Sequence, residues 1–220
     1  MIRQSRIQSI FFDLDGTLID SAPGILACFA AILREEGITP LLSLDHSLIG
    51  PPLRKTLQIV TGIEESNELD HLTERFKAHY DSSGYLETRV YEGVEELLSL
   101  LHQQETPLAV ATNKRRIPTL KILKHLGWEH YFRLVGSLDT PVPAYPDKAS
   151  LVAAMLQELN LSPFMTLYVG DKLDDGLAAR VNEMPFAAAA WGYGKWDPGA
   201  AVNDWAIVRT PMEIMDLIIC

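Results

Sequence analysis

The chain has 220 residues, of which 47% are hydrophobic and 22% are charged. This composition is typical of a globular protein and excludes extended disorder, and the length suits one domain with or without a large insertion. The 19 basic and 29 acidic residues give a net charge of −10, which opposes binding to a nucleic acid backbone. A small anionic substrate is still compatible, because local cations and a metal can reverse the field within one cleft.

Signals for secretion or membrane insertion are missing from the sequence pattern. No apolar run approaches the roughly 18–20 residues that span a bilayer. The run Ile10–Phe12 is too short for a signal peptide and leads directly into Asp13. The two cysteines, Cys28 and Cys220, form neither a disulfide framework nor a metal-ligand pattern. We therefore expect a cytoplasmic protein that has no membrane or nucleic acid partner.

Short apolar runs alternate with helical patterns along most of the chain. Apolar stripes at helical spacing begin at Val94 and at Leu151. This alternation is typical of βαβ units, so we predict an α/β, Rossmann-like fold, with a parallel sheet that carries helices on both faces. The five predicted strands are Ile7–Phe12, Pro107–Ala111, Phe132–Val135, Thr166–Val169 and Phe186–Ala190.

One stretch, from about Ser21 to Val90, departs from this alternation. It shows helical periodicity without a convincing strand, and it is divided by breaks such as Gly50-Pro51-Pro52. Roughly 70 residues suffice for a small helical bundle, which we place over the end of the sheet. The predicted parts are a core of residues 1–20 and 91–220, an inserted helical domain of residues 21–90, and linkers near Ile19–Pro23 and Ser82–Glu92.

Carboxylates follow two of the predicted strands at their carboxyl ends, where ligands bind in open parallel sheets. Asp13 and Asp15 leave the first strand two residues apart, so an extended backbone points both to the same side. Asp171 follows the fourth strand. Such an oxygen-rich group suits Mg²⁺, held by carboxylates, waters and a substrate phosphate. Each aspartate alone is better explained as a turn former or helix cap, but their recurrence at equivalent strand ends favours a site.

Groups that suit a phosphate lie at the same predicted edge. Thr112 and Asn113 follow the second strand and offer a hydroxyl and an amide without adding charge. Lys148 begins the helix that leads into the fourth strand, and it is a point cation for a phosphate oxygen, although alone it is an ordinary surface lysine. Asp175 lies four residues after Asp171, on the same helix face. It would orient the metal or its waters, and the plainer alternative is an acidic first turn.

These segments resemble the motifs of the haloacid dehalogenase superfamily of phosphohydrolases. The segment Asp13–Ser21 is similar to the family's nucleophile motif in nearly complete form. Thr112, Lys148 and Gly170-Asp171 with Asp175 are similar to its second, third and fourth motifs, in the same order. The insertion resembles the family's helical cap, so the resemblance covers almost the whole chain.

The resemblance implies a Mg²⁺-dependent phosphatase that hydrolyses a small phosphorylated metabolite through an aspartyl-phosphate intermediate. Asp13 would attack phosphorus, and Asp15 would protonate the leaving oxygen and then activate water. Mg²⁺ would be bound by Asp13, by the backbone carbonyl of Asp15 and by Asp171, with Asp175 in support. The implied phosphate ligands are Thr112, Asn113 and Lys148.

Two further segments resemble the phosphoglycolate phosphatase branch and its nucleotidase-like relatives. They are Gly50-Pro51-Pro52-Leu53 and Trp191-Gly192-Tyr193-Gly194, although turn and packing needs explain the second equally well. Lys148 is followed by Ala149-Ser150, where much of that branch has a Lys-Pro pair. Phosphoglycolate is therefore one candidate substrate. A nucleoside monophosphate phosphatase, a sugar-phosphate mutase and a non-enzymatic phospho-accepting module are the alternatives, and the chain is expected to be a monomer or a homodimer.

Basic side chains near the predicted site are the last candidates. Arg54 follows the Gly50-Pro51-Pro52 turn, and we predict that it reaches a substrate anion, with a solvated helix face as the plainer alternative. The run Lys114–Arg116 follows Thr112, and we interpret it as a solvated helix start.

Overall fold

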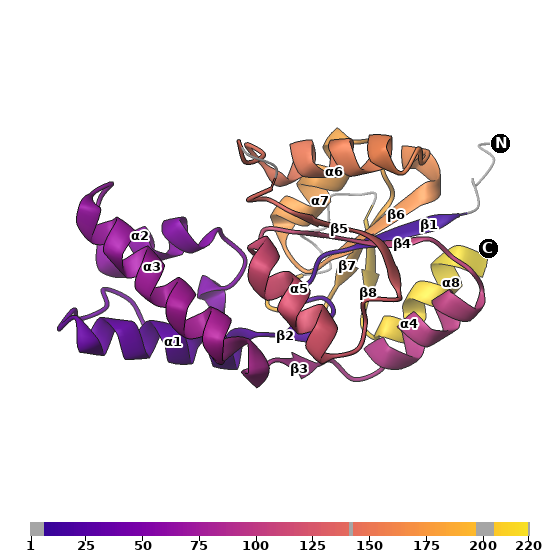
Figure 1. Cartoon of the computed structure of the whole chain (residues 1–220). Coiled ribbons are helices and arrows are strands. Elements are labelled where there is room, and N and C mark those ends of the chain that lie inside the picture. The colour runs from indigo at the N-terminus through magenta and orange to yellow at the C-terminus, as the bar shows by residue number, and fades with distance from the viewer. Residues whose placement is uncertain (1–6, 141–142, 197–204, 220) are drawn as a thin grey trace.

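The computed structural model describes residues 7–140, 143–196 and 205–219. Its main sheet has six strands that pair in parallel in the order β5-β4-β1-β6-β7-β8 (Figure 1). The predicted parallel α/β fold is therefore confirmed. The strands are β1 (Ser9–Phe12), β4 (Leu108–Thr112), β5 (Phe132–Ser137), β6 (Thr166–Gly170), β7 (Phe186–Ala189) and β8 (Ala206–Val208).

Helices cover both faces of this sheet, as the pattern predicts (Figure 1). Alternate residues of each buried strand point to opposite faces, so Ile10 and Phe12 join one apolar cluster whereas Phe11 joins the other. The first cluster packs against α4, α5 and α8, and the second against α6 and α7. These helices are α4 (Val94–Gln103), α5 (Arg116–His125), α6 (Lys148–Glu158), α7 (Leu173–Val181) and α8 (Ile214–Ile219).

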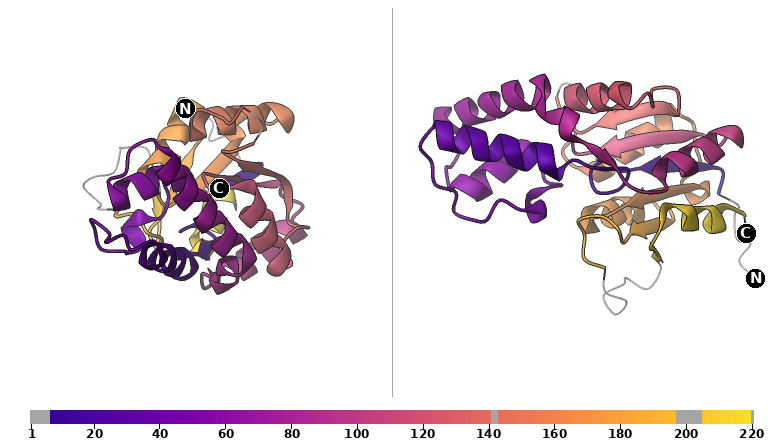
Figure 2. Two further views of the ribbon diagram at one scale, coloured as in Figure 1. Left: turned by 60° about the vertical axis from the view of Figure 1, so that its left-hand side comes forward. Right: turned by 90° about the horizontal axis from the view of Figure 1, so that it is seen from below.

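A helical insertion lies beyond one end of the sheet (Figure 2, right). Its helices have their own apolar cluster, separate from the two clusters of the sheet. Ser66 caps the third helix by accepting a hydrogen bond from the Leu69 amide, and Gly62 ends the second helix in the left-handed conformation that favours glycine. The helices are α1 (Ala22–Glu35), α2 (Leu53–Thr61) and α3 (Asn67–Ser82), and short 3₁₀ turns lie at His46–Leu48, Gly84–Glu87, Pro163–Met165 and Pro211–Glu213.

The insertion is joined to the sheet by a small antiparallel pair of strands, β2 (Ile19–Asp20) and β3 (Arg89–Val90). Both lie within the predicted linkers, where no strand is predicted, because two-residue strands carry no periodicity. The helical periodicity predicted from about Ser21 to Val90 is confirmed, because α1, α2 and α3 lie in this stretch. That the insertion is a domain of its own stays a prediction. Among the described residues, no helix combines the length and the apolar character needed to cross a membrane.

Candidate active site

Three neighbouring strands bring the predicted site residues to one edge of the sheet. β1 lies between β4 and β6, so Asp13, Thr112 and Asp171 leave adjacent strand ends. The ladder extends beyond β1, because the Asp13 amide donates a 2.9 Å hydrogen bond to the Val169 carbonyl. All three side chains are buried. The chain leaves this edge toward the helical insertion (Figure 1).

Three buried carboxylates form the centre of the site. One oxygen from each of Asp13, Asp171 and Asp175 lies within 4.8 Å of the others. Burial raises the pKa of Asp13 well above its usual value, against the attraction of Lys148. Burial, followed by the charge of Asp175, raises the pKa of Asp171 to about 7. Three carboxylates in so small a volume repel each other unless a cation is shared between them, so the donor set suits a hard divalent cation.

The environment of Asp171 supports this interpretation. Its Oδ1 atom is buried and has no hydrogen-bond partner among the described residues, so this oxygen is free to bind a cation. Its Oδ2 atom accepts hydrogen bonds from the backbone amides of Tyr193 at 2.8 Å and Gly194 at 3.2 Å. A Cβ atom at Gly192 would lie 2.4 Å from the Asp171 Cβ, and one at Gly16 would lie 2.3 Å from Asp171 Oδ2. The segment Trp191–Gly194 therefore positions Asp171. The sequence pattern does not indicate this role for the segment.

Lys148 lies between two of the carboxylates. Its Nζ atom is 3.1 Å from Asp13 Oδ1 and also forms an ion pair with Asp175. Burial acts to lower the pKa of the Lys148 ammonium, but the two aspartates outweigh burial and raise it well above its usual value. Asp175 accepts further hydrogen bonds from the Lys172 amide at 2.9 Å and the Tyr168 hydroxyl at 3.3 Å. Asp175 thus anchors Lys148 beside Asp13.

Asp15 lies outside this carboxylate group and has partners of its own. Its Oδ1 atom accepts hydrogen bonds from Lys114 Nζ at 3.0 Å and from the Ser21 hydroxyl at 2.5 Å. The Lys114 side chain is only 6% exposed, and its ammonium lies 4.7 Å from the centre of the Tyr80 ring. The interpretation of Lys114 as a solvated helix residue is therefore wrong, because α3 covers it. No sequence signal other than its place after Thr112 indicates this pairing.

Thr112 and Asn113 occupy the end of β4. The Thr112 Oγ1 atom accepts a 3.2 Å hydrogen bond from the Lys114 amide. The Asn113 amide group donates to the Gly50 carbonyl at 3.1 Å and to Asp174 Oδ2 at 3.0 Å. Asn113 therefore links the insertion to the start of α7. Phosphate binding by these two residues stays a prediction.

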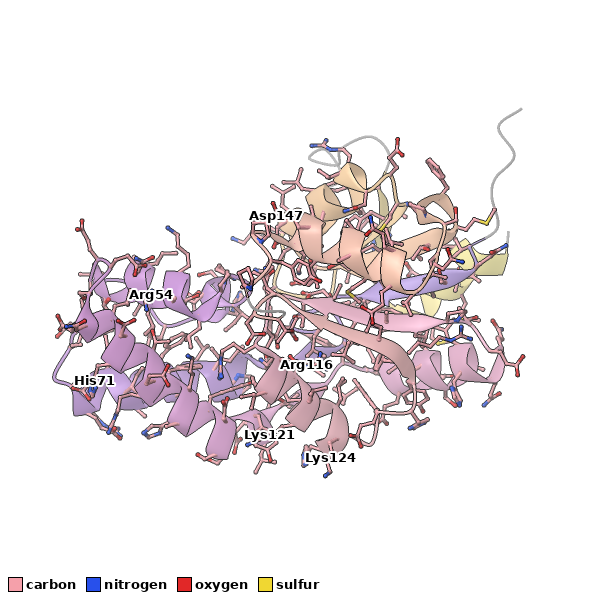
Figure 3. All side chains as sticks on the ribbon, turned by 45° about the horizontal axis from the view of Figure 1, so that its top comes forward. Arg54, His71, Arg116, Lys121, Lys124 and Asp147 are labelled. Carbon is pink, nitrogen blue, oxygen red and sulfur yellow. The ribbon has the colours of Figure 1, made fainter. Side chains whose placement is uncertain are left out.

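The structure does not bring Arg54 to this group of residues. Its guanidinium lies on the insertion (Figure 3), where Nε donates to both Glu65 oxygens at 2.9 and 3.1 Å. It also pairs with Asp70, at 2.5 Å from Nη1. Because two carboxylates already occupy the guanidinium, the predicted substrate contact of Arg54 has no support here. The sequence pattern places Arg54 after a turn but does not show which acids face it.

Comparison with known proteins assigns this fold to a family. The family model described as haloacid dehalogenase-like hydrolase matches residues 10–189. The chain belongs to the haloacid dehalogenase-like hydrolase family. The predicted family resemblance is thereby confirmed, and so is the hydrolase class that it implies. The matched segment contains every aspartate of the site and the whole helical insertion.

Relatives of this haloacid dehalogenase-like hydrolase carry different names. The tyrosine-protein kinase PtkA of Mycobacterium tuberculosis is 32% identical over 191 residues, which is 86% of this chain but only 64% of that relative's length. The phosphoglycolate phosphatase of Xanthomonas campestris is 32% identical over 208 residues, which is 93% of each chain. The crystal structure of a predicted phosphatase from Clostridium acetobutylicum matches with a TM-score of 0.85 and 26% identity, over 97% of this chain and 99% of that one.

Proposed function

We propose that this chain is a Mg²⁺-dependent phosphatase that hydrolyses a small phosphorylated metabolite through an aspartyl-phosphate on Asp13. The observation that carries the proposal is the contact between Asp13 Oδ1 and Lys148 Nζ at 3.1 Å, within a group of three buried aspartates. A cation beside a strand-end carboxylate lets a phosphate dianion approach that carboxylate. The similarity to a phosphoglycolate phosphatase over 93% of both chains supports the same activity.

The residues present fit the metal that this family chemistry requires. Asp13 and Asp171 would bind Mg²⁺ with the backbone carbonyl of Asp15, and Asp175 would support them through Lys148. The unpartnered Oδ1 atom of Asp171 is the observation behind this assignment. When bound, Mg²⁺ neutralises the carboxylates and polarises the phosphoryl group.

The proposed reaction has two displacements at phosphorus. In the first, a carboxylate oxygen of Asp13 attacks phosphorus and the bond to the leaving oxygen breaks, while protonated Asp15 gives that oxygen its proton. In the second, Asp15 takes a proton from water as the water oxygen attacks phosphorus, which releases inorganic phosphate and restores Asp13. Lys148 and the Thr112 hydroxyl would hold the phosphoryl oxygens. Lys114 and Ser21, which donate hydrogen bonds to Asp15 Oδ1, would hold this side chain in place.

The proposed partner of the site is a small phosphorylated metabolite, and phosphoglycolate is one candidate because of the relative named above. We also propose that the enzyme acts in the cytoplasm as a monomer or homodimer, as expected from its sequence. The helical insertion would cover the site during the first displacement and open for product release.

The decisive experiment measures hydrolysis of p-nitrophenyl phosphate by the purified chain with Mg²⁺ and with excess chelator. We expect many turnovers per enzyme with Mg²⁺ and none with chelator. Asp13→Asn should abolish turnover, whereas Asp70→Asn, which removes one carboxylate far from the site, should retain it. Acid quenching of the wild-type reaction followed by peptide mass analysis should place phosphate on Asp13. Turnover in Asp13→Asn, with deamidation excluded, would refute the mechanism.

A further inference from the structure

A cavity lies between the helical insertion and the sheet edge, next to the proposed general acid. Asp15 and Lys114 form its floor, whereas Phe29, Phe76 and Tyr80 line it from α1 and α3. The rings form a continuous aromatic wall, because the Phe29 and Phe76 centroids are 4.6 Å apart and those of Phe76 and Tyr80 are 5.6 Å apart. Further apolar lining comes from Ile25, Leu48, Ile49 and Leu53. A group attached to the leaving oxygen at Asp15 would enter this cavity.

The cations of this cavity are already neutralised. Among the described residues that line it, the basic side chains are Lys114 and Arg115. Lys114 pairs with Asp15. The Arg115 guanidinium forms a two-pronged pair with Asp81 of α3, with Nη1–Oδ2 at 2.9 Å and Nη2–Oδ1 at 2.5 Å. Both partners are less than one-fifth exposed, so solvent screens this pair only weakly.

A second anion on a substrate would therefore meet paired cations. To bind it, Arg115 would have to release Asp81, and that carboxylate would stay partly buried without a partner. The exchange replaces the Asp81 carboxylate by the substrate anion as the partner of Arg115, so it adds little binding free energy. An uncharged group has no such cost, because it leaves both ion pairs intact and contacts the aromatic and aliphatic side chains that line the cavity.

We propose that the preferred substrate of this site is a phosphomonoester whose leaving group is an uncharged, largely apolar alkyl or aryl group. This inference rests on the proposed phosphatase function and specifies its substrate class. It ranks esters with a second anion, phosphoglycolate among them, below uncharged esters of the same size. The specificity follows from the Phe29–Phe76–Tyr80 wall together with the closed Arg115–Asp81 pair.

Matched pairs of esters test this class directly. Isobutyl phosphate and phosphoglycolate have similar shape and differ in the terminal carboxylate, and phenyl phosphate and 4-carboxyphenyl phosphate form an aromatic pair. We expect the uncharged member of each pair to have a kcat/KM about tenfold higher, the size of one charged hydrogen bond. A preference for the charged members overturns this proposal alone. Absence of turnover on all four esters and on p-nitrophenyl phosphate removes the proposed function, and this proposal with it.

A charge variant provides an independent test of the reason for the preference. Asp81→Asn leaves Arg115 without its carboxylate, so it should raise the ratio of kcat/KM for phosphoglycolate to that for isobutyl phosphate by about tenfold. Asp70→Asn is the matched control, because it removes a partner of Arg54 outside the cavity, and its ratio should equal that of the wild type. The ratio cancels a general loss of closure or folded fraction.

A double variant covers the case in which Asp81→Asn does not fold. Arg115→Met combined with Asp81→Leu removes both charges and keeps the volume. We expect its kcat/KM ratio to match the wild type within a factor of about two, since the removed pair has no free charge to offer. A tenfold fall in the ratio would show that Arg115 recognises a substrate anion, and it would overturn the proposal.

Discussion

Lys114 Nζ lies 3.0 Å from Asp15 Oδ1 and 3.2 Å from Asp15 Oδ2, in a pair that is almost closed to solvent. Burial acts to lower the pKa of the Lys114 ammonium, but Asp15 and Tyr80 together outweigh burial and raise that pKa above its ordinary value. Lys114 therefore stays charged at neutral pH. Lys114 follows β4, the strand next to β1. From there it holds the Asp15 carboxylate, which we propose as the general acid and base.

The first prediction removes this cation. In Lys114→Met, the Asp15 carboxylate loses a charged hydrogen bond, which contributes about 1.5–3 kcal/mol. We expect kcat on p-nitrophenyl phosphate to fall about 10- to 100-fold, and the melting temperature to fall because a buried charge is left unpaired. Lys114→Arg keeps the charge and should recover part of kcat. Wild-type kcat in a folded Lys114→Met enzyme would show that Asp15 works without this partner.

The second prediction concerns metal binding without turnover. A ligand that binds only the folded state stabilises it by about 2.7 kcal/mol at a concentration of 100 times its Kd, which corresponds to about 5–10 °C in melting temperature for a chain of this size. We expect Mg²⁺ to give such a shift in the wild type and none in Asp171→Asn. The control is Asp174→Asn, because Asp174 is exposed and precedes Asp175 in the chain. This variant should retain the Mg²⁺-induced shift in melting temperature. An equal shift in Asp171→Asn would remove Asp171 from the metal site.

The third prediction is a pH dependence of the metal-free protein. Burial raises the pKa of Asp171 to about 7, whereas an unfolded aspartate titrates near ~3.9. Between these values the folded state binds more protons than the unfolded state. The free energy of unfolding should therefore fall as pH rises from about 4 to 7, by up to about 1.4 kcal/mol per pH unit from this residue. Urea unfolding at several pH values in chelator measures the slope, and Asp171→Asn should flatten it. An unchanged slope in that variant would contradict the assignment.

The carboxylate group could be predicted from sequence because its signals are local. Apolar runs mark β1 and β6, and parallel strands bring their carboxyl ends together whatever the details of packing. Asp13, Asp171 and Lys148 therefore meet as the motif order indicates. The sequence pattern does not predict strand β8, because this strand is very short. It has three residues, Ala206–Val208, and so short a run carries no periodicity.

The partners of the charged residues could not be predicted from sequence, since they depend on how the insertion packs. Lys114 is buried because Tyr80 of α3 lies over it. Arg54 of α2 instead pairs with Glu65, in the connection to α3, and with Asp70 of α3. A pattern along the chain shows that a side chain is charged. It does not show which opposite charge lies nearest in space.

The segment after β7 gives the last prediction, because Tyr193 connects the metal site to the start of the insertion. Its backbone amide donates to Asp171, whereas its hydroxyl accepts from the Ser21 amide at 2.8 Å and the Ala22 amide at 3.1 Å. The hydroxyl also donates to Asp20 Oδ1 at 2.7 Å. The Ser21 side chain makes no capping bond to α1. The hydroxyl of Tyr193 therefore satisfies the Ser21 amide and shares the Ala22 amide with Asp20 Oδ1, which accepts from it at 3.1 Å.

Tyr193→Phe keeps the backbone amide and removes the hydroxyl. The Ser21 amide then loses its partner, whereas the Ala22 amide keeps its 3.1 Å hydrogen bond to Asp20 Oδ1. The free energy of unfolding should therefore fall by about 1–3 kcal/mol, the cost of one unsatisfied buried donor. We expect kcat to fall, because the Ser21 hydroxyl, which donates to Asp15, lies in the released segment. The Mg²⁺-induced shift in melting temperature should stay as in the wild type, since Asp171 keeps its amide donor. The control is Tyr131→Phe, remote from the site, which should change neither the free energy of unfolding nor kcat. A lost Mg²⁺ shift in Tyr193→Phe would show that the hydroxyl is needed to position Asp171. An unchanged kcat would show that the hydroxyl has no part in holding Ser21.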